Sequence, residues 1–258
     1  MENGDMVDRR SGVPAFRQVA ADLRDKISAG DYAPGDRLPS ERELVETYGV
    51  SRPTIRDAVN VLRTEGIVTA EHGRGVFVRP PSSIRRLSRS RLSKAARDRN
   101  QGAFLADAAA GGFMPSTSVK IRFEQADERV ASLLAISAGD EVTVRDRLMR
   151  ADGLVVQLAV SRLPRKFTRD TTIEQVDTGK GGAYARLEEA GHAIATFAEY
   201  VGARMPTPEE ASALQLAEGT PAITVTRVAY GSDGIPLEIN DMVLPADKYE
   251  LSYEWVAD

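Results

Sequence analysis

The stretch from Leu38 to Val78 constrains the fold of this chain more than any other, because it has the pattern of two short helices followed by a hairpin. Ser40 and Glu43 have the Ser-x-x-Glu spacing of a capping box, which predicts the start of a short helix. Gly49 predicts the tight turn that ends this helix, and Ser51 is placed to cap a second one. The stretch therefore predicts a helix-turn-helix followed by a wing.

The second predicted helix has two distinct faces. Its apolar residues recur at helical spacing and should face the core: Ile55, Ala58, Val59 and Leu62. The residues left on the opposite face are Arg52, Pro53, Arg56 and Asn60. The outward face of the second helix is the one that meets a DNA groove in a helix-turn-helix. We expect Arg52 and Arg56 to contact bases there, since arginine can bind guanine with two hydrogen bonds. The alternative is a solvated basic stripe paired with Asp57 or Glu65.

An amphipathic helix of roughly four turns is predicted before this motif. Its apolar positions are Phe16, Val19, Ala20, Leu23 and Ile27, and Gly30 and Pro34-Gly35 end it. After the motif, residues 67–70 and 76–78 have the composition of two strands joined by a turn at residues 72–75. Residues 1–80 therefore predict a winged helix-turn-helix domain.

Charge is unevenly distributed along the 258 residues. The total of −4 combines −1 for residues 1–80, +6 for residues 81–100 and −9 for residues 101–258. Residues 81–100 are basic and serine-rich, which predicts a linker or a partly helical arm. The predicted DNA-binding domain is nearly neutral, so its specificity must come from placed contacts rather than bulk positive charge.

The remainder, residues 101–258, contains an internal repeat at an offset of about 80 residues. Residues 131–139 match residues 211–219 as a short helix ending at a glycine cap, at Gly139 and Gly219. A strand-like stretch precedes each helix, and a hairpin with an Asp-Gly turn follows it. Each half is therefore strand, helix, strand, strand, and residues 183–189 add a helix between the halves. This predicts an α+β domain with a six-stranded, mostly antiparallel sheet.

Composition excludes several classes of site. The chain has no cysteine and only two histidines without a ligand-spaced cluster, so we expect neither a metal site nor a thiol nucleophile. No apolar run is long enough to cross a bilayer, and the amino-terminal residues lack the apolar core of a secretion signal. We expect a cytoplasmic, non-enzymatic protein without a cofactor or a membrane partner.

The first domain resembles the GntR family of bacterial transcription regulators, through PGDRLPSERELVETYGVSRPTIRDAVNVLRTEGIV and the wing HGRGVFV. The second resembles the UTRA effector domain of the HutC subfamily, through RLMRADG, LPRKF, GGAYARLEEAGH and DGIPLEINDMVLPADKYEL. The resemblance implies a chorismate lyase-like fold for this domain. It also implies a homodimeric regulator, most simply a repressor, that binds a near-palindromic double-stranded DNA operator under the control of a small-molecule effector.

The resemblance also implies which residues bind. We assign DNA contacts to Arg42, Ser51, Arg52, Pro53, Thr54, Arg56, His72, Gly73 and Arg74. Capping alone would explain Ser51, and a plain turn would explain His72. We assign effector contacts to Arg147, Ser161, Gly181, Gly182, Tyr184 and Glu238. Arg147 and Glu238 suit a charged or zwitterionic ligand, and the alternative is an internal Arg-Glu pair between the two halves.

The sequence departs from the family pattern at Ala159, Val155 and Gly182, which makes a sugar-phosphate effector doubtful. Two other functions remain open from the sequence. The second domain could serve only dimerisation, in an effector-independent repressor. Alternatively, it could be an enzyme that the first domain targets to DNA.

Overall fold

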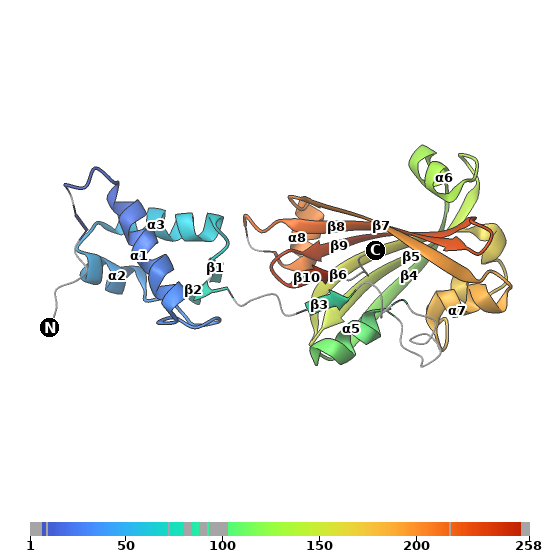
Figure 1. Ribbon diagram of the computed structural model, residues 1–258, viewed down its shortest axis with the longest axis horizontal. Coiled ribbons are helices and arrows are strands. Elements are labelled where there is room, and N and C mark those ends of the chain that lie inside the picture. The colour runs from blue at the N-terminus through green and yellow to red at the C-terminus, as the bar shows by residue number, and fades with distance from the viewer. Residues whose placement is uncertain are drawn as a thin grey trace, which may run out of the picture. The chain divides into compact units, whose positions relative to one another are not determined.

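The structure is a computed structural model that describes residues 7–8, 10–71, 73–79, 84–87, 92, 103–216 and 218–253. The chain forms two compact units (Figure 1). The first contains residues 1–81 and 217–220, and the second contains residues 82–216 and 221–258. His72, one of the expected DNA contacts, lies outside the described residues.

The first unit contains three helices and a hairpin, as predicted. The helices are α1 (Ala15–Ala29), α2 (Glu41–Tyr48) and α3 (Arg52–Thr64), and the strands are β1 (Val68–Glu71) and β2 (Gly75–Val78). The two strands pair antiparallel. This arrangement confirms the winged helix-turn-helix.

Local sequence fixes the helix ends in this unit. Ser40 and Glu43 form both hydrogen bonds of the capping box at the start of α2. Ser51 caps α3 by accepting a hydrogen bond from the Thr54 backbone N–H. Gly30 and Gly49 end α1 and α2 with φ of 88° and 63°, in the left-handed region that glycine adopts without a steric penalty. The turn between α2 and α3 is therefore set by residues 49–51.

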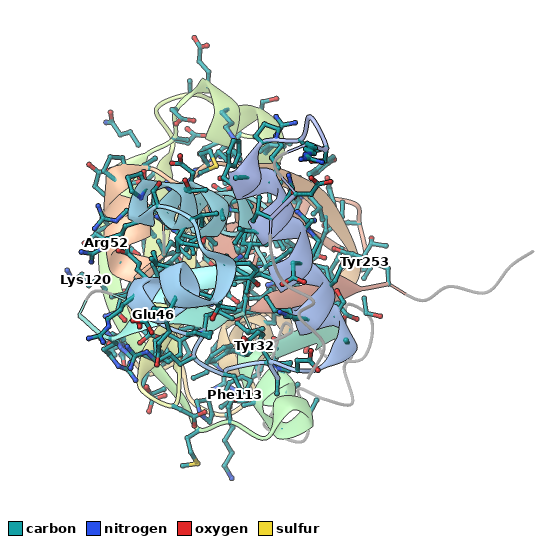
Figure 2. The ribbon with its side chains drawn as sticks, turned by 90° about the vertical axis from the view of Figure 1, so that its left-hand side faces the viewer. Tyr32, Glu46, Arg52, Phe113, Lys120 and Tyr253 are labelled. Carbon is teal, nitrogen blue, oxygen red and sulfur yellow. The ribbon has the colours of Figure 1, made fainter. Side chains whose placement is uncertain are left out.

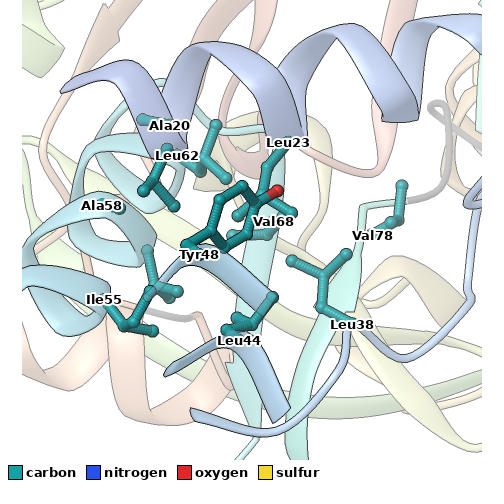
Figure 3. Close-up of a cluster of buried hydrophobic side chains, with 12 residues drawn as sticks. Ala20, Leu23, Leu38, Leu44, Tyr48, Ile55, Ala58, Leu62, Val68 and Val78 are labelled. Atoms are coloured by element: carbon teal, nitrogen blue, oxygen red, sulfur yellow. The ribbon is translucent and has the colours of Figure 1, made fainter. Parts of the chain in front are cut away.

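The core of the first unit lies between α1, α3 and the hairpin, and its side chains come from every element (Figure 3). Leu23, Ile55 and Leu62 are fully buried. The burial of one such side chain stabilises the fold by about 1.5–3 kcal/mol. The hydroxyl of Tyr48 also donates to Asp22 of α1 at 2.5 Å, which ties the end of α2 to α1. These contacts hold α3 with its polar face outward.

The second unit is built on a six-stranded antiparallel sheet of order β4-β5-β6-β9-β8-β7. The sheet strands are β4 (Pro115–Gln125), β5 (Glu141–Ala151), β6 (Leu154–Pro164), β7 (Ile194–Arg204), β8 (Ala222–Gly231) and β9 (Pro236–Pro245). The helices are α5 (Ala103–Gly111), α6 (Glu128–Leu134), α7 (Gly182–Glu189) and α8 (Pro208–Leu214), with two 3-10 helices, η2 (Arg165–Phe167) and η3 (Thr172–Glu174). The predicted α+β class is confirmed.

The predicted repeat accounts for this topology. The first half is β4-α6-β5-β6 and the second is β7-α8-β8-β9, and the halves join where β6 pairs with β9. The predicted glycine caps are wrong. Helices α6 and α8 end at Ala135 and Gln215, each with a φ of 51°, whereas Gly139 and Gly219 lie four residues later in the turns that lead into β5 and β8.

A strand occurs inside the segment that the sequence predicted as a linker. Strand β3 (Ile84–Leu87) pairs in parallel with β10 (Tyr249–Ser252), near the other end of the sequence. Ile84 is buried and packs with Tyr249 and Met242. The basic composition of residues 81–100 concealed this strand, because its pairing partner is distant in sequence.

Candidate functional sites

The outward face of α3 is polar and exposed, as predicted. Arg52, Pro53, Arg56 and Asn60 are all exposed, while the four apolar residues of the opposite face are buried. Arg52 extends from the start of α3 at the surface of the first unit (Figure 2). The Thr54 hydroxyl lies 2.8 Å from the Ser51 hydroxyl, so both side chains already take part in the cap.

A single carboxylate joins the two arginines of this face. Arg52 Nε lies 2.5 Å from Glu41 Oε2, and Arg56 Nε lies 2.9 Å from Glu41 Oε1. Hydrogen bonds from Arg56 and then Arg52 lower the pKa of Glu41. The alternative pairing with Asp57 or Glu65 is wrong, since Glu65 pairs with Arg24 at 2.7 Å. Sequence analysis missed Glu41, although its place in the first turn of α2 beside the motif was visible.

In the cluster of Glu41, Arg52 and Arg56, the terminal nitrogens of both arginines are left to bind other groups. Both arginines use Nε toward Glu41, and within the described part of the chain no hydrogen bond occupies their terminal nitrogens. The side chains of Arg52 and Arg56 are 67% and 58% exposed. The terminal nitrogens are the atoms that form paired hydrogen bonds with guanine O6 and N7. The cluster thus presents two oriented donors at the start of α3.

The other expected DNA contacts lie around this cluster. Arg42 is 88% exposed and pairs with Glu46 at 3.0 Å. At the wing, Gly73 has a φ of 73° and is exposed. Arg74 is 72% exposed, bonds to Glu71, and lies over the Phe77 ring at 5.5 Å. Arg74 at the wing is therefore exposed to solvent and its charge is paired with that of Glu71.

In the second unit, a row of polar side chains crosses one face of the sheet. Strand register places these residues opposite one another across five strands, and we call them the polar row: Arg145, Ser161, Asn240, Arg227 and Glu199. Ser161 and Asn240 lie at the junction of the two halves and are 0% and 2% exposed. Directly paired residues on one face have Cβ atoms about 5 Å apart. The fold thus buries a continuous polar strip at its centre.

Several expected effector contacts meet at this row. Arg147 donates to the Ser161 hydroxyl, and Tyr184 of α7 donates to Glu238. Arg147 and Glu238 thus each contact a different side chain, rather than forming the internal pair that we considered as an alternative. Gly181 caps α7 and Gly182 is its first residue, so both lie within one turn of Tyr184.

Burial determines the protonation of these groups. Burial raises the pKa of the Tyr184 phenol, and the negative charge of the nearby Glu238 raises it further. The phenol therefore keeps its proton and can donate a hydrogen bond. Burial and then the charge of Arg147 lower the pKa of Arg145 to about 10. Arg145 donates to the carbonyl oxygens of Ile173, Gln175 and Val176 at 2.5, 2.6 and 3.2 Å. Arg145 is thus a cation at neutral pH, and it holds residues 173–176, the segment that precedes α7, against the sheet.

Sequence analysis did not assign Arg227 and Asn240 to the site. Arg227 is 4% exposed and its guanidinium carbon lies 5.8 Å from the Tyr184 ring centre and 5.6 Å from that of Phe197. Arg227 occupies the position in the second half that Arg147 has in the first. That equivalence was a signal for Arg227, whereas Asn240 had none, because only the strand register brings it between the halves.

The opposite face of the sheet has a cavity of about 500 Å³, lined by residues of α6, α8 and the five strands β5 to β9. Asp241, next to Asn240 in sequence, points to this face and pairs with Arg129 at 2.6 Å and Arg162 at 3.1 Å. No group of acidic residues and histidines in the described ranges could hold a metal ion. Among the described helices, none is long and apolar enough to span a bilayer.

Comparisons with known proteins agree with this arrangement. Residues 15–78 match the family model described as bacterial regulatory proteins, gntR family, and residues 111–250 match the UTRA domain. The chain is 31% identical to the HTH-type transcriptional regulator SCO4628 of Streptomyces coelicolor, over 94% of this chain and 93% of that protein. It is 25% identical to the HTH-type transcriptional repressor NagR of Bacillus subtilis, over 94% and 95%.

Two solved structures align with nearly the whole of this chain. A crystal structure of a GntR-family transcriptional regulator aligns with a TM-score of 0.67 at 31% identity, covering 95% of this chain and 98% of that one. PhnF from Mycobacterium smegmatis aligns with a TM-score of 0.59 at 27% identity, covering 93% and 100%.

Proposed function

Since this chain belongs to the GntR family of bacterial regulatory proteins and is a transcriptional regulator with a UTRA domain, we propose that it acts as a dimeric repressor. In this proposal the helix-turn-helix unit binds a near-palindromic operator in the cytoplasm, and a small-molecule effector in the UTRA domain alters its affinity. No cofactor takes part. The family consists of regulators, so the alternative of a DNA-targeted enzyme is set aside.

The observation that carries the DNA-binding proposal is the cluster of Glu41, Arg52 and Arg56. Two exposed arginines are oriented at the start of α3 with their terminal nitrogens toward solvent. In a helix-turn-helix the amino-terminal residues of the second helix reach base edges in the major groove. Arg42 and Arg74 then suit phosphate contacts on either side, and these contacts would position the helix without reading sequence.

Dimerisation follows from what one recognition helix can read. A single α3 contacts only a few base pairs, whereas two copies related by a two-fold axis read two half-sites about 34–36 Å apart. Such a dimer predicts an inverted-repeat operator. Analytical ultracentrifugation of the full chain tests the dimer, and a monomer at micromolar concentration would exclude it.

Effector control is supported by the buried polar strip. A domain that served only to dimerise would gain nothing from the burial of Arg145 and Arg227 near Glu238, because burial of charge is costly unless it is compensated. Operator binding titrated with a low-molecular-weight extract of the source cells tests this control. A change in affinity supports it, and operator affinity that no extract fraction alters would favour the effector-independent alternative.

A further inference from the structure

A hollow of about 360 Å³ lies in the first unit between α3 and the hairpin. The outward face of α3 lines one side of it with Arg56 and Asn60, and the hairpin lines another with Gly75. The start of α2 and the segment before it, with Arg37, complete the lining. The hollow therefore lies directly beside the helix that we propose to read the operator.

The hairpin holds Arg37 at this hollow. The Leu38 backbone N–H donates to the Val76 carbonyl oxygen at 2.8 Å, and Arg37 itself bridges antiparallel to Phe77. The guanidinium group then lies across Gly75, where an added Cβ atom would come within 2.7 Å of Nε of Arg37. Glycine at this position permits the close approach, and a larger residue would displace the guanidinium. The backbone pairing and the glycine thus fix the place of Arg37.

No side chain holds the guanidinium of Arg37 within the described ranges. Arg37 is exposed and forms neither a hydrogen bond nor an ion pair there. Hydrogen bonds from Ser40 lower the pKa of Glu43, and the charge of Arg37 adds to this effect without an ion pair. Glu43 is engaged in the capping box of α2. A guanidinium keeps its charge and has five N–H donors, so Arg37 is available to bind an anion.

The other arginines of the hollow already have partners. Arg56 donates to Glu41 at 2.9 Å, and Arg63 donates to Asn60 at 3.1 Å. Glu41 is in turn shared with Arg52. The charge in the hollow that remains without a partner is therefore that of Arg37.

The dimensions of DNA determine what covers this hollow when α3 is bound. The major groove of B-DNA is about 12 Å wide, and an α-helix with its side chains is about 10–12 Å across. A helix in the groove thus reaches from one sugar-phosphate backbone to the other. A hollow beside the outward face of α3 is then covered by one of these backbones. Its apolar lining residues, among them Val59 and Val76, suit contact with deoxyribose.

We propose that this hollow is a binding site for the DNA backbone, in which Arg37 donates to a phosphate at the edge of the major groove that α3 occupies. This inference rests on the proposed operator binding and adds a phosphate-binding residue that sequence analysis did not assign. A phosphate contact carries no base information. Arg37 therefore fixes the register of α3 on the duplex, and Arg52 and Arg56 read the bases.

The first test is the salt dependence of binding. Fluorescence anisotropy measures the affinity of the full chain for an operator duplex recovered by in vitro selection and for a scrambled duplex, between about 50 and 200 mM salt. For Arg37→Gln, the slope of log affinity against log salt should fall by about 0.9 per protomer, or about 1.8 for a dimer. Affinity should fall by the same factor on both duplexes, because both contain the phosphate.

The matched control is Arg17→Gln. Arg17 is an exposed arginine of α1, a helix that contributes no residue to the hollow, and its replacement removes the same charge. Its salt slope should stay at the wild-type value. A loss of affinity in Arg37→Gln that is confined to the operator, or a slope that falls equally in Arg17→Gln, would overturn the inference.

The second test locates the contact on the DNA. Neutral methylphosphonates are placed one at a time along the operator, and the affinity of each duplex is measured. In the wild type and in Arg17→Gln, one position at the groove edge of each half-site should weaken binding, and Arg37→Gln should no longer respond at that position. Arg37→Lys keeps the charge without the planar fork, so it should retain a weaker response there. If Arg37→Gln responds at every position as the wild type does, the inference is overturned.

A structural role and the proposed function are tested separately. Because no described side chain holds Arg37, Arg37→Gln should have the Tm of the wild type, and a lower Tm with every methylphosphonate response retained would assign Arg37 to the hairpin instead. If the wild type binds no duplex, the proposed operator binding fails. If it binds its operator and Arg37→Gln keeps the wild-type salt slope, operator binding stands and only the backbone site is overturned.

Discussion

Replacement of Glu41 by Gln should reduce the specificity of DNA binding more than it changes the stability of the fold. The carboxylate accepts hydrogen bonds from Arg52 and Arg56 at 2.5 and 2.9 Å, and all three side chains are at least one-third exposed. Exposed ion pairs stabilise a fold by only about 0.2–1 kcal/mol each. Because the amide oxygen of the substituted side chain can still accept one of the two hydrogen bonds, the free energy of unfolding should fall by about the worth of one pair, about 1 kcal/mol or less.

The loss of operator affinity in Glu41→Gln should be larger than the loss of stability. Without the carboxylate, Arg52 and Arg56 would no longer be held in place in the free protein and would become ordered only when DNA binds. Ordering a long side chain at an interface costs about 0.5–1.5 kcal/mol. With two arginines partly released, the affinity for the operator should weaken by about 1–2 kcal/mol, or roughly 5- to 30-fold. Binding to unrelated DNA should not weaken, since the substitution removes a negative charge close to the phosphates.

Fluorescence anisotropy with an operator duplex and a scrambled duplex, at several salt concentrations, measures the ratio of the two affinities. Glu65→Gln is the matched control, because it removes the same charge from a pair with Arg24 that lies away from the start of α3. A ratio for Glu41→Gln equal to that for Glu65→Gln would refute the reasoning.

Three further predictions follow from the two units. Arg52→Ala and Arg56→Ala should each weaken operator binding by about 1–3 kcal/mol with little change in scrambled-duplex binding, and anisotropy that shows equal losses on both duplexes would contradict base contact. Ile55→Ala should destabilise the first unit by about 2–5 kcal/mol in urea unfolding, because the side chain is fully buried, and a loss below about 1 kcal/mol would contradict the core assignment. Burial would raise the pKa of Asp241, but hydrogen bonds from Arg129 and Thr226 outweigh it and the pKa is lowered. Its ionised form thus stabilises the fold above the unfolded pKa of about 3.9, and this contribution disappears as the pH falls through the lower folded value. The Tm difference between Asp241→Asn and the wild type should therefore be full at neutral pH and shrink below about pH 4, and a constant difference would contradict it.

The first unit could be predicted almost completely from sequence, because its signals are local. The capping box at Ser40 and Glu43, the glycine at Gly49 and the spacing in α3 each determine structure within a few residues. The bridging role of Glu41 could not be predicted. It depends on the distance between α2 and α3, and that distance is set by the packing of the whole unit.

The second unit could be predicted where the repeat carried the information. The two halves and their hairpins followed from internal similarity, but the β3–β10 pair joins residues more than 160 positions apart and had no local signal. The same reason explains the site. Tyr184 and Glu238 were found through family resemblance, whereas Asn240 became visible only once the register placed it between Ser161 and Arg227.

In vitro selection of random duplexes with the purified full chain tests the central claim most directly, namely that α3 reads a specific sequence as part of a dimer. We predict an enriched inverted repeat with half-sites about 10 base pairs apart, each with a guanine whose enrichment disappears in Arg52→Ala or Arg56→Ala. Selection that yields no motif, or a motif that both variants enrich unchanged, would contradict the claim.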